Sequence, residues 1–543
     1  MNEYIVTCRS YEDLEDLYDD METPGGSLYI PDRSVDLAHR RPISRNTHYM
    51  LTEEEAIEIR NDERVIACER LAKDRGITPT PFWAQTGDFN KPTGIFAADD
   101  KNWGLYRVIE GNSVSNWGSD GSPKIENRTI TTTASGKNVD VIVVDSHINP
   151  DHPEFLSDSG SRVNQFNWFQ YNSVLGYGSN GTYTYSTSSA SPNDNHGSHV
   201  AGICCGNTQG LARESNIYNI PFDSDLSGVS DWDEKLWDYI RHFHKNKSIN
   251  PETGRRNPTI TNNSWGYAND VLLPSITSVT YRGVVTDVLG TVAEKKAILE
   301  DNGVPVGLDT YVQVPVRVAA VDADVQDAID DGIIVISSAG NSYWNCDIPS
   351  GSDYNNQLFA DFQYFHSRGS SPAAASNAIS VGAIGSKVSE YKSNFSNWGE
   401  RVDIWAPGGD IISAVYDDSP SQYDPTVADP RDSSYYLAAI GGTSMASPQV
   451  CGVIACLAES HQNITQSQAL QYLIENSLPE VGTTGDINRS TYEALGDSNN
   501  RYLFFAQKRK QTGSLQQSTF GNRNSSESGI KYPRTNNMVT KRQ

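Results

Sequence analysis

A helix that is apolar on most of its sides is the feature that most constrains the fold of this chain. It runs over residues 449–458, so it needs a core large enough to surround it. Its apolar side chains include Val450, Val453, Ile454 and Leu457. A turn of small residues precedes it, in which Ser444 stands at the helix mouth and Pro448 suits the first turn. Ser444 is therefore either an ordinary helix cap or a nucleophile that needs a base and an acid from elsewhere.

Apolar strands alternate with helical patterns after Trp103, which predicts an α/β domain on a mostly parallel sheet flanked by helices. The expected strands are residues 139–144, 259–263, 333–336, 378–383 and 402–407, and a helix is expected at 323–330. Residues 267–321 show no clear period, so we expect an insertion over the surface there. In open α/β sheets the functional side chains gather where strands end.

Three polar side chains stand at such places. Asp145 follows strand 139–144, and His196 opens a small-residue helix that allows close approach to neighbouring backbone. Asn341 follows strand 333–336, where its amide is either a turn residue or a donor to an oxyanion. A metal site at His196 and His199 is disfavoured, because no acidic third ligand stands nearby.

Residues 1–71 are expected to form a separate small α+β unit. The order strand, helix, strand, strand, helix, strand is the split ferredoxin-like pattern, with strands near 4–7, 27–30, 47–51 and 65–69. Thr52 and Glu55 form a capping box for the second helix. Pattern alone leaves the role of this unit open. Residues 72–102 are rich in Pro, Thr, Gly and Asp, which predicts an exposed connector that is easily cut.

Charge divides the chain unevenly. The net charge of -25 makes nucleic acid an unsuitable partner for the body of the protein. Residues 501–543 carry nine Lys and Arg against one Glu, so this tail is basic, and its polar composition favours a flexible segment that serves an assembly partner.

The seven cysteines show no metal-ligand spacing, which favours reduced, buried thiols. The N-terminus lacks the pattern of a secretory signal, and no stretch is apolar for long enough to span a membrane. We therefore expect a protein of the cytoplasm or of a larger particle rather than a classically secreted one.

Asp145, His196 and Ser444 follow one another in the chain order of the subtilisin type of catalytic triad. Residues 143–146, 196–202, 339–341 and 442–448 resemble the motifs of the subtilisin-like serine proteases, the subtilases of peptidase family S8. The resemblance implies a subtilisin-like catalytic domain over residues 103–500. The first 71 residues resemble the inhibitor I9-type propeptide of many subtilases, which implies an intramolecular folding aid and inhibitor.

The resemblance implies a self-processing serine endopeptidase that cuts its own connector between residues 71 and 102. Ser444 would be the nucleophile, His196 the general base and Asp145 its orienting acid. The Asn341 amide and the Ser444 N–H would hold the oxyanion. The substrate would pair with a backbone edge formed by three residues, Ser264, Trp265 and Gly266.

Departures from the family concern metal binding and the triad's surroundings. Residues 203–211 are short, as in the proteinase K group, so the calcium-holding loop of subtilisins is not expected. No cofactor is required, although Glu154 matches a calcium ligand of some members and leaves calcium open. His147 stands where the family has Gly, and we expect its ring to point outward.

An alternative function is a catalytically silent subtilase scaffold that serves as a binding component of a larger assembly. The N-terminus without a signal, the basic tail and His147 favour it. The complete set of catalytic residue types favours the enzyme.

Overall fold

The computed structural model of the 543-residue chain describes most of its length. The described residues are 1–30, 36–40, 46–70, 83–92, 96–114, 121–185, 194–221, 232–306, 310–387, 389–416, 426–482 and 493–506. The chain divides into two compact units. The N-terminal unit comprises Met1–Thr86 and Thr129–Ser135, and the larger unit comprises Gly87–Arg128 and Gly136–Gln543.

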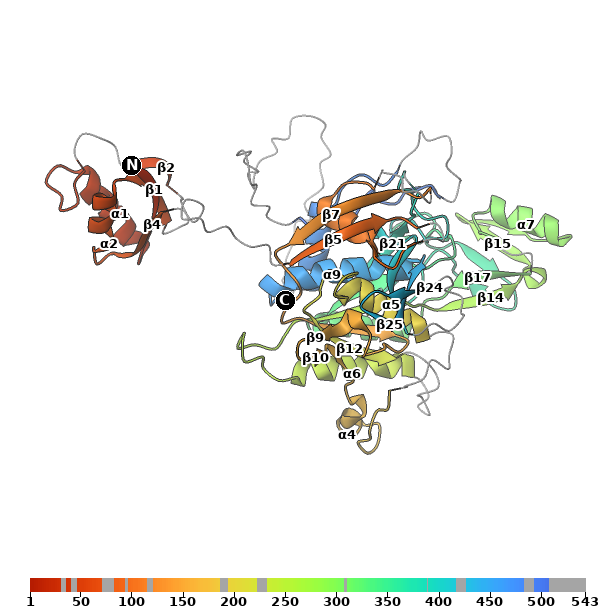
Figure 1. Cartoon of the computed structure of the whole chain (residues 1–543). Helices are drawn as coiled ribbons and strands as arrows, with labels where there is room; N and C mark the ends of the chain where they lie inside the picture. Colours follow the sequence, from red (N-terminus) through yellow and green to blue (C-terminus); the bar gives the residue numbers. More distant parts are fainter. Residues whose placement is uncertain are drawn as a thin grey trace, which may run out of the picture. The chain divides into compact units, whose positions relative to one another are not determined.

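The N-terminal unit confirms the split ferredoxin-like order (Figure 1). Its elements are β1 (Asn2–Cys8), α1 (Tyr11–Glu22), β2 (Asp36–Arg40), β3 (Asn46–Leu51), α2 (Glu53–Arg60) and β4 (Val65–Arg70). The antiparallel sheet has the order β2-β3-β1-β4, and the capping box of Thr52 and Glu55 is present. The strand expected at residues 27–30 is wrong. Asp20 accepts hydrogen bonds from the N–H and hydroxyl of Ser27, both at 2.7 Å, which hold a turn there instead.

The expected exposed connector does not extend to residue 102. Residues 71–82 and 93–95 lie outside the described residues, but β5 (Trp83–Asn90) and β6 (Asp100–Asn102) form a sheet with β7 (Lys124–Thr132) in the order β6-β5-β7. Phe89 and Lys91 are fully buried, and Lys91 Nζ lies 2.7 Å from a Glu390 carboxylate oxygen. The segment from Gly87 onward is therefore part of the larger unit.

A seven-stranded sheet forms the centre of the larger unit, as the alternation of strands and helices predicted. Its order is β11-β12-β8-β13-β18-β21-β22, and every described pair is parallel. The strands are β8 (Asp140–Asp145), β11 (Val163–Asn164), β12 (Asn216–Pro221), β13 (Thr259–Asn263), β18 (Ile334–Ser338), β21 (Ile379–Ile384) and β22 (Ile404–Pro407). Strands β8, β13, β18 and β21 are buried along their whole length, which requires cover on both faces.

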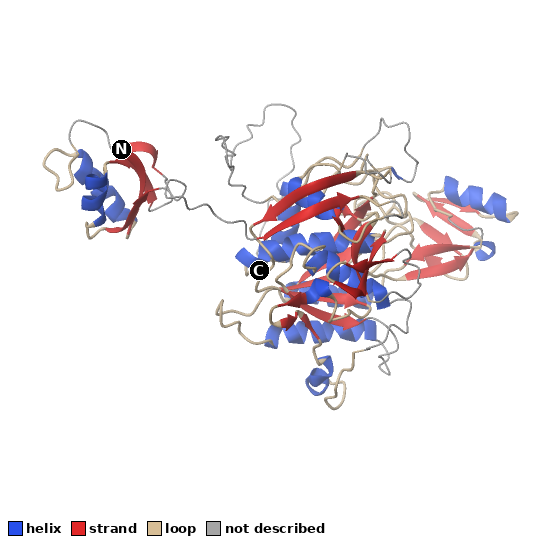
Figure 2. Ribbon diagram, viewed as in Figure 1, coloured by secondary structure: helices blue, strands red, loops and turns tan. Residues whose placement is uncertain are grey.

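Helices supply that cover (Figure 2). On one face, α6 (Trp232–Asn246) and α8 (Ala319–Asp330) pack on the side chains of Ile142 and Val144, which alternate along β8. On the other face, α5 (Asp194–Cys205) packs against α9 (Thr443–Ser460), and α9 spans strands β13 to β22. Helix α9 is buried along nearly its full length, as its apolar sides predicted. The larger unit also contains α3 (Trp103–Glu110) and α10 (Gln466–Asn476).

The expected surface insertion is a folded lobe, which we call the insertion lobe (Figure 1). It contains β14 (Ala268–Leu272), η5 (Leu273–Ser275), β15 (Ser278–Tyr281), β16 (Val284–Asp287), α7 (Val292–Asp301) and β17 (Tyr311–Pro315). A second segment completes its core with Trp344, Cys346 and Leu358, and adds β19 (Gln357–Phe359) and β20 (Gln363–Tyr364). Its core comes from two separated segments, so residues 267–321 alone lack a clear period.

Smaller elements complete the larger unit. They are η2 (Pro153–Phe155), β9 (Leu156–Ser157), β10 (Gly160–Ser161), η3 (Trp168–Tyr171), α4 (Asn172–Leu175), β23 (Ile411–Val415), β24 (Thr426–Asp429) and β25 (Asp432–Ile440). Tyr502 and Leu503 are fully buried, and the Leu503 N–H donates to the Trp405 carbonyl at 2.8 Å. The basic tail therefore starts later than residue 501, and its residues from 507 lie outside the described ones. Among the described helices, none has the length and apolar character needed to cross a bilayer.

Candidate active site

Three neighbouring strands end at one edge of the central sheet and bring the candidate residues together. Asp145 is the last residue of β8, Ser264 directly follows β13, and Asn341 follows β18 by three residues. Helices α5 and α9 begin at this edge and carry His196 and Ser444 in their first turns. Parallel strands place their carboxyl ends together, which explains why residues so distant in sequence meet here.

Asp145 and His196 form a direct pair. His196 Nδ1 lies 2.7 Å from Asp145 Oδ1, and the Ser146 N–H donates to the same oxygen at 2.8 Å. A carboxylate only accepts hydrogen bonds, so Nδ1 carries the proton and Nε2 is left to act as a base. Burial alone would lower the pKa of His196, but the charge and hydrogen bond of Asp145 outweigh it and raise this pKa above its ordinary value.

Gly197 lets helix α5 approach the backbone that follows Asp145. A Cβ atom at this position would lie 2.3 Å from the Ser146 carbonyl oxygen, closer than any side chain tolerates. The Gly197 N–H instead donates to the Ser146 hydroxyl at 2.8 Å. The close approach expected of this small-residue helix is therefore confirmed.

Ser444 does not cap its helix. The N-cap of α9 is Gly442, which makes no side-chain capping hydrogen bond, and Ser444 is the second helical residue. The Ser444 hydroxyl donates to the Ser264 carbonyl at 3.3 Å. Among the hydrogen bonds of the described residues, none joins this hydroxyl to His196. The structure thus pairs His196 with Asp145 and places Ser444 at the same sheet edge, with its hydroxyl turned to Ser264.

Pro448 lies inside α9 rather than in the first turn, because the helix begins at Thr443. A proline has no N–H, so the Ser444 carbonyl four residues earlier lacks its helical donor. The Ser264 hydroxyl donates to that carbonyl at 3.0 Å and replaces the missing bond. The start of α9 is therefore tied to the segment after β13.

The amide of Asn341 has a defined orientation. Its Oδ1 accepts from the Thr443 N–H at 2.9 Å and from the Thr443 hydroxyl at 2.8 Å. Since the oxygen is held by Thr443, the Nδ2 group is the end that remains to donate to another molecule. Asn341 and Ser444 line the same cavity.

This cavity, which we call the serine pocket, has a volume of about 190 Å³. Ser264, Trp265 and Gly266 all line it, and none of its lining side chains carries a charge. Gln313 and Pro315 of the insertion lobe form another part of its wall. Sequence reasoning missed these two residues, since no motif marks them.

His147 does not point outward, so that expectation is wrong. Its side chain is 2% exposed, and its ring lies edge-on to Tyr185 with the ring centroids 6.2 Å apart. Tyr185 itself packs against the core beside β8, so the His147 ring lies next to this core rather than in solvent.

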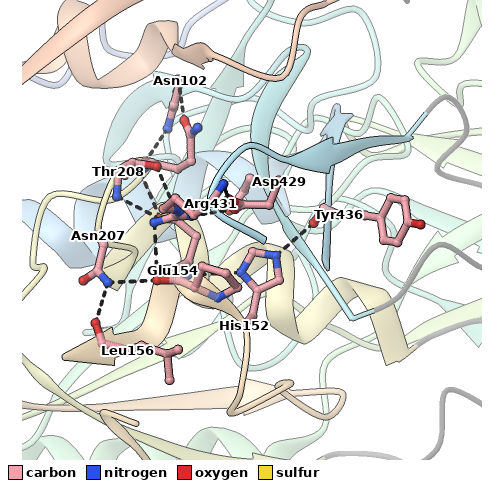
Figure 3. A network of polar contacts seen from close by, with 12 residues as sticks. Asn102, His152, Glu154, Leu156, Asn207, Thr208, Asp429, Arg431 and Tyr436 are labelled. Atoms are coloured by element: carbon pink, nitrogen blue, oxygen red, sulfur yellow. Dashed lines mark hydrogen bonds and ion pairs between the residues drawn. The ribbon is translucent and has the colours of Figure 1, made fainter. Parts of the chain in front are cut away.

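The surroundings of Glu154 show whether a calcium ion could bind at this residue (Figure 3). Its fully buried carboxylate accepts from the Thr208 hydroxyl at 2.5 Å, from the Thr208 N–H at 3.0 Å and from the Gln209 N–H at 3.1 Å. The Arg431 guanidinium lies 2.5 Å from the same carboxylate and also pairs with Asp429. Burial raises the pKa of Glu154, but Arg431 and Thr208 outweigh it and leave this pKa below its usual value.

A cation from the chain itself thus occupies the place next to Glu154. In the described part of the chain, no group of three or more His, Cys, Asp or Glu side chains is arranged to hold a metal. Calcium is bound by six to eight oxygen atoms, and an arginine at the carboxylate prevents such a shell. The residues around Glu154 therefore do not fit a calcium ion.

All seven cysteines are buried and none forms a disulfide, which confirms the expectation of buried thiols.

Comparison with known proteins identifies the family. The model of the Subtilase family, Peptidase S8, matches residues 136–521. Alkaline serine exoprotease A of Vibrio alginolyticus is 24% identical over 444 residues, which cover 81% of this chain and 57% of that protein. An extracellular serine proteinase of a Thermus species is 26% identical over 381 residues, which cover 69% of this chain and 64% of that protein. The chain thus spans less than two thirds of the length of these two relatives.

A solved structure, that of a cold adapted subtilisin-like serine proteinase, is similar at 22% identity and a TM-score of 0.44, covering 75% of this chain and 98% of that one.

These comparisons correct the expected location. One relative is named an extracellular serine proteinase, a name that points away from the cytoplasm. The expectation of a protein of the cytoplasm or of a larger particle is therefore wrong. Since the family model matches more than half of the 543 residues and the central parallel sheet agrees with it, the chain belongs to the subtilase family.

Proposed function

We propose that this chain is a serine endopeptidase that is made as a self-inhibited, self-processing precursor. The observation that carries the proposal is the 2.7 Å pair of His196 and Asp145 at the sheet edge where Ser444 and Asn341 line one pocket. Membership of the subtilase family supports the same chemistry. As the name of the extracellular Thermus relative suggests, it acts outside the cytoplasm.

Ser444 attacks the carbonyl carbon of the substrate peptide bond, while Nε2 of His196 takes the hydroxyl proton. For this step the hydroxyl rotates away from the Ser264 carbonyl, and the 3.3 Å bond that it leaves is long and weak. The C–N bond then breaks as His196 returns the proton to the leaving amine. A water molecule, deprotonated by His196, hydrolyses the acyl-enzyme and restores the Ser444 hydroxyl. Asp145 stabilises the imidazolium of His196 during both acylation and deacylation.

The negative charge that develops on the carbonyl oxygen would be held by Asn341 Nδ2 and the Ser444 backbone N–H. Thr443 holds the other end of the amide, so the donor is oriented before the reaction begins. Such a donor typically contributes about 3–4 kcal/mol to the stability of the transition state.

The substrate would lie as an extended strand along Ser264, Trp265 and Gly266, with one side chain in the serine pocket. The uncharged lining of this pocket favours an uncharged side chain there, because a charged one would be desolvated without a partner. Gln313 from the insertion lobe adds a polar group to its wall.

The N-terminal unit would act as the inhibitory propeptide, and the chain would cut itself between residues 71 and 82. Strand β5 begins at Trp83, and Phe89 and Lys91 are buried in the larger unit. A cut at Phe89 or later would need the buried part of this segment to unfold first, whereas a cut before Trp83 would leave the whole strand intact.

Labelling with a fluorophosphonate tests the proposal directly. We expect covalent labelling of the wild type, no labelling of Ser444→Ala, and strongly slowed labelling of His196→Gln. Failure of the folded wild type to label would favour the silent scaffold instead.

A further inference from the structure

A second cavity, of about 440 Å³, lies next to the serine pocket. Pro315 lines both cavities, and the Val316 N–H donates to the Tyr267 carbonyl at 2.9 Å, which attaches this wall to the segment after the substrate edge. Residues 315–322 form one side, and residues 363–368 form the other. We call it the arginine pocket, after Arg317 and Arg368.

One of its two arginines is neutralised within the pocket. Arg317 Nε donates to Asp322 Oδ2 at 2.7 Å, and its Nη1 donates to the Tyr354 hydroxyl at 2.7 Å. The second oxygen of Asp322 accepts from the Ser371 hydroxyl at 2.6 Å. Arg317 and Asp322 therefore form a closed pair that adds no net charge.

Arg368 keeps its charge. Its Nε donates to the Tyr354 carbonyl at 3.2 Å and its Nη2 to Asn355 Oδ1 at 2.8 Å, and both acceptors are neutral. Its guanidinium carbon lies 3.5 Å from the Phe365 ring centroid and 4.8 Å from that of Tyr354. Among the residues that the structure describes, no carboxylate lies within the 4.0 Å of an ion pair with Arg368. The pocket thus holds a positive charge fixed between two aromatic rings.

A fixed guanidinium suits a carboxylate, whose two oxygens match its planar donors. The apolar faces of Tyr364 and Phe365 would cover the methylene groups of an acidic side chain. The chain as a whole carries a net charge of -25, which repels acidic peptides, so a local cation beside the cleft changes which peptides bind. Continuity with the serine pocket through Pro315 makes a bound polypeptide the source of that carboxylate.

We propose that the arginine pocket binds an Asp or Glu side chain of the polypeptide substrate through Arg368. The inference rests on the proposed function and adds a substrate class to it: polypeptides with an acidic residue at one fixed position away from the scissile bond. The pocket belongs in part to the insertion lobe, so the lobe selects substrates.

Two series of fluorogenic peptides test this inference. Both series share one core sequence. One series places Glu, and the other Gln, at successive positions on both sides of the scissile bond. We expect the wild type to favour Glu over Gln at one position by about tenfold in kcat/KM, the effect of one charged hydrogen-bonded contact. The preference should weaken as ionic strength rises.

Arg368→Gln should abolish the preference, so that the Glu and Gln peptides are cleaved with equal kcat/KM. Lys245→Gln is the matched control, since it removes one positive charge from the larger unit while Asp331 keeps its pair with Arg241. That variant should retain the preference. Equal cleavage of Glu and Gln peptides at every position by the wild type, or a preference that survives Arg368→Gln, would overturn the inference.

Cleavage of the Gln peptides and fluorophosphonate labelling report the proposed function without involving Arg368. If the wild type cleaves no peptide and does not label, the proposed function fails and this inference fails with it. If it labels and cleaves without any preference for Glu, only the inference fails.

Discussion

The Ser264 hydroxyl donates a 3.0 Å hydrogen bond to the Ser444 carbonyl, the group that Pro448 leaves without a helical donor. In return, the Ser444 hydroxyl donates to the Ser264 carbonyl at 3.3 Å. The residue after β13 and the start of α9 therefore fix each other. A proline inside a buried helix is tolerated because a neighbouring segment supplies the missing donor.

Ser264→Ala should lower the free energy of unfolding by about 1–3 kcal/mol, since it leaves a buried carbonyl without a partner. Pro448→Ala restores a backbone N–H at that point of α9. The double variant should therefore lose less free energy of unfolding than the losses of the two single variants added together. Urea unfolding of both single variants and the double variant, in a Ser444→Ala background that prevents self-digestion, measures the coupling. Strictly additive effects would mean that the Ser264 hydroxyl does not replace the helical donor.

The pH dependence of kcat/KM should reflect the pair of His196 with Asp145. Catalysis needs a neutral imidazole, and Asp145 outweighs burial to raise the pKa of His196, so activity should fall as the pH drops through a value above 6.5. Asp145→Asn should reduce kcat by about 10⁴-fold and move the acid limb to lower pH, because burial then acts alone. An acid limb that stays in place in this variant would contradict the assignment.

The same raised pKa affects stability. Protonated His196 contributes stability that is fully present below the ordinary pKa of 6.5 and is lost as the pH rises through the folded value. Unfolding measured across this range in Ser444→Ala and in Ser444→Ala with His196→Gln should differ most at low pH. A difference that grows with pH would contradict the sign of the shift.

Asn341→Ala should lower kcat by roughly 10²–10³-fold with little change in KM, because its amide would act on the transition state and not on the bound substrate. Steady-state kinetics on one neutral peptide measures both constants. A rise in KM at constant kcat would instead place Asn341 in substrate binding.

Arg431→Met should lower the free energy of unfolding by about 3 kcal/mol, the low end for a broken buried ion pair because Arg431 is partly exposed. A calcium chelator should change the melting temperatures of the wild type and of Glu154→Gln by the same amount, because Arg431 and not calcium supplies the cation at Glu154. Lys137→Met, which breaks an exposed pair with Glu252, is the control and should change little. A chelator effect that is larger in the wild type than in Glu154→Gln would contradict this account.

The parts of the fold that were predictable from the sequence are those with a local signature. Strands buried on both faces, such as β8 and β18, appear in the sequence as short apolar runs. Asp145 and Asn341 stand out because each is a polar residue at or just after the end of such a run. The capping box of α2 is likewise local, because it is formed by Thr52 and Glu55 alone.

What was not predictable depends on partners far away in the sequence. Lys91 appeared to belong to an exposed connector because its partner Glu390 lies 299 residues later. The core of the insertion lobe is complete only when Trp344 and Leu358 pack against residues that precede position 315. His147 is buried beside Tyr185, and the helical donor lost at Pro448 is replaced by Ser264, directly after β13.

Intact-mass analysis of purified wild type beside Ser444→Ala tests the central claim most directly. The account predicts that the wild type loses an N-terminal fragment that ends between residues 71 and 82, while Ser444→Ala keeps all 543 residues. Masses that differ only by the oxygen atom of the substitution, with both proteins uncut or both cut at the same place, would contradict a peptidase that processes itself through Ser444.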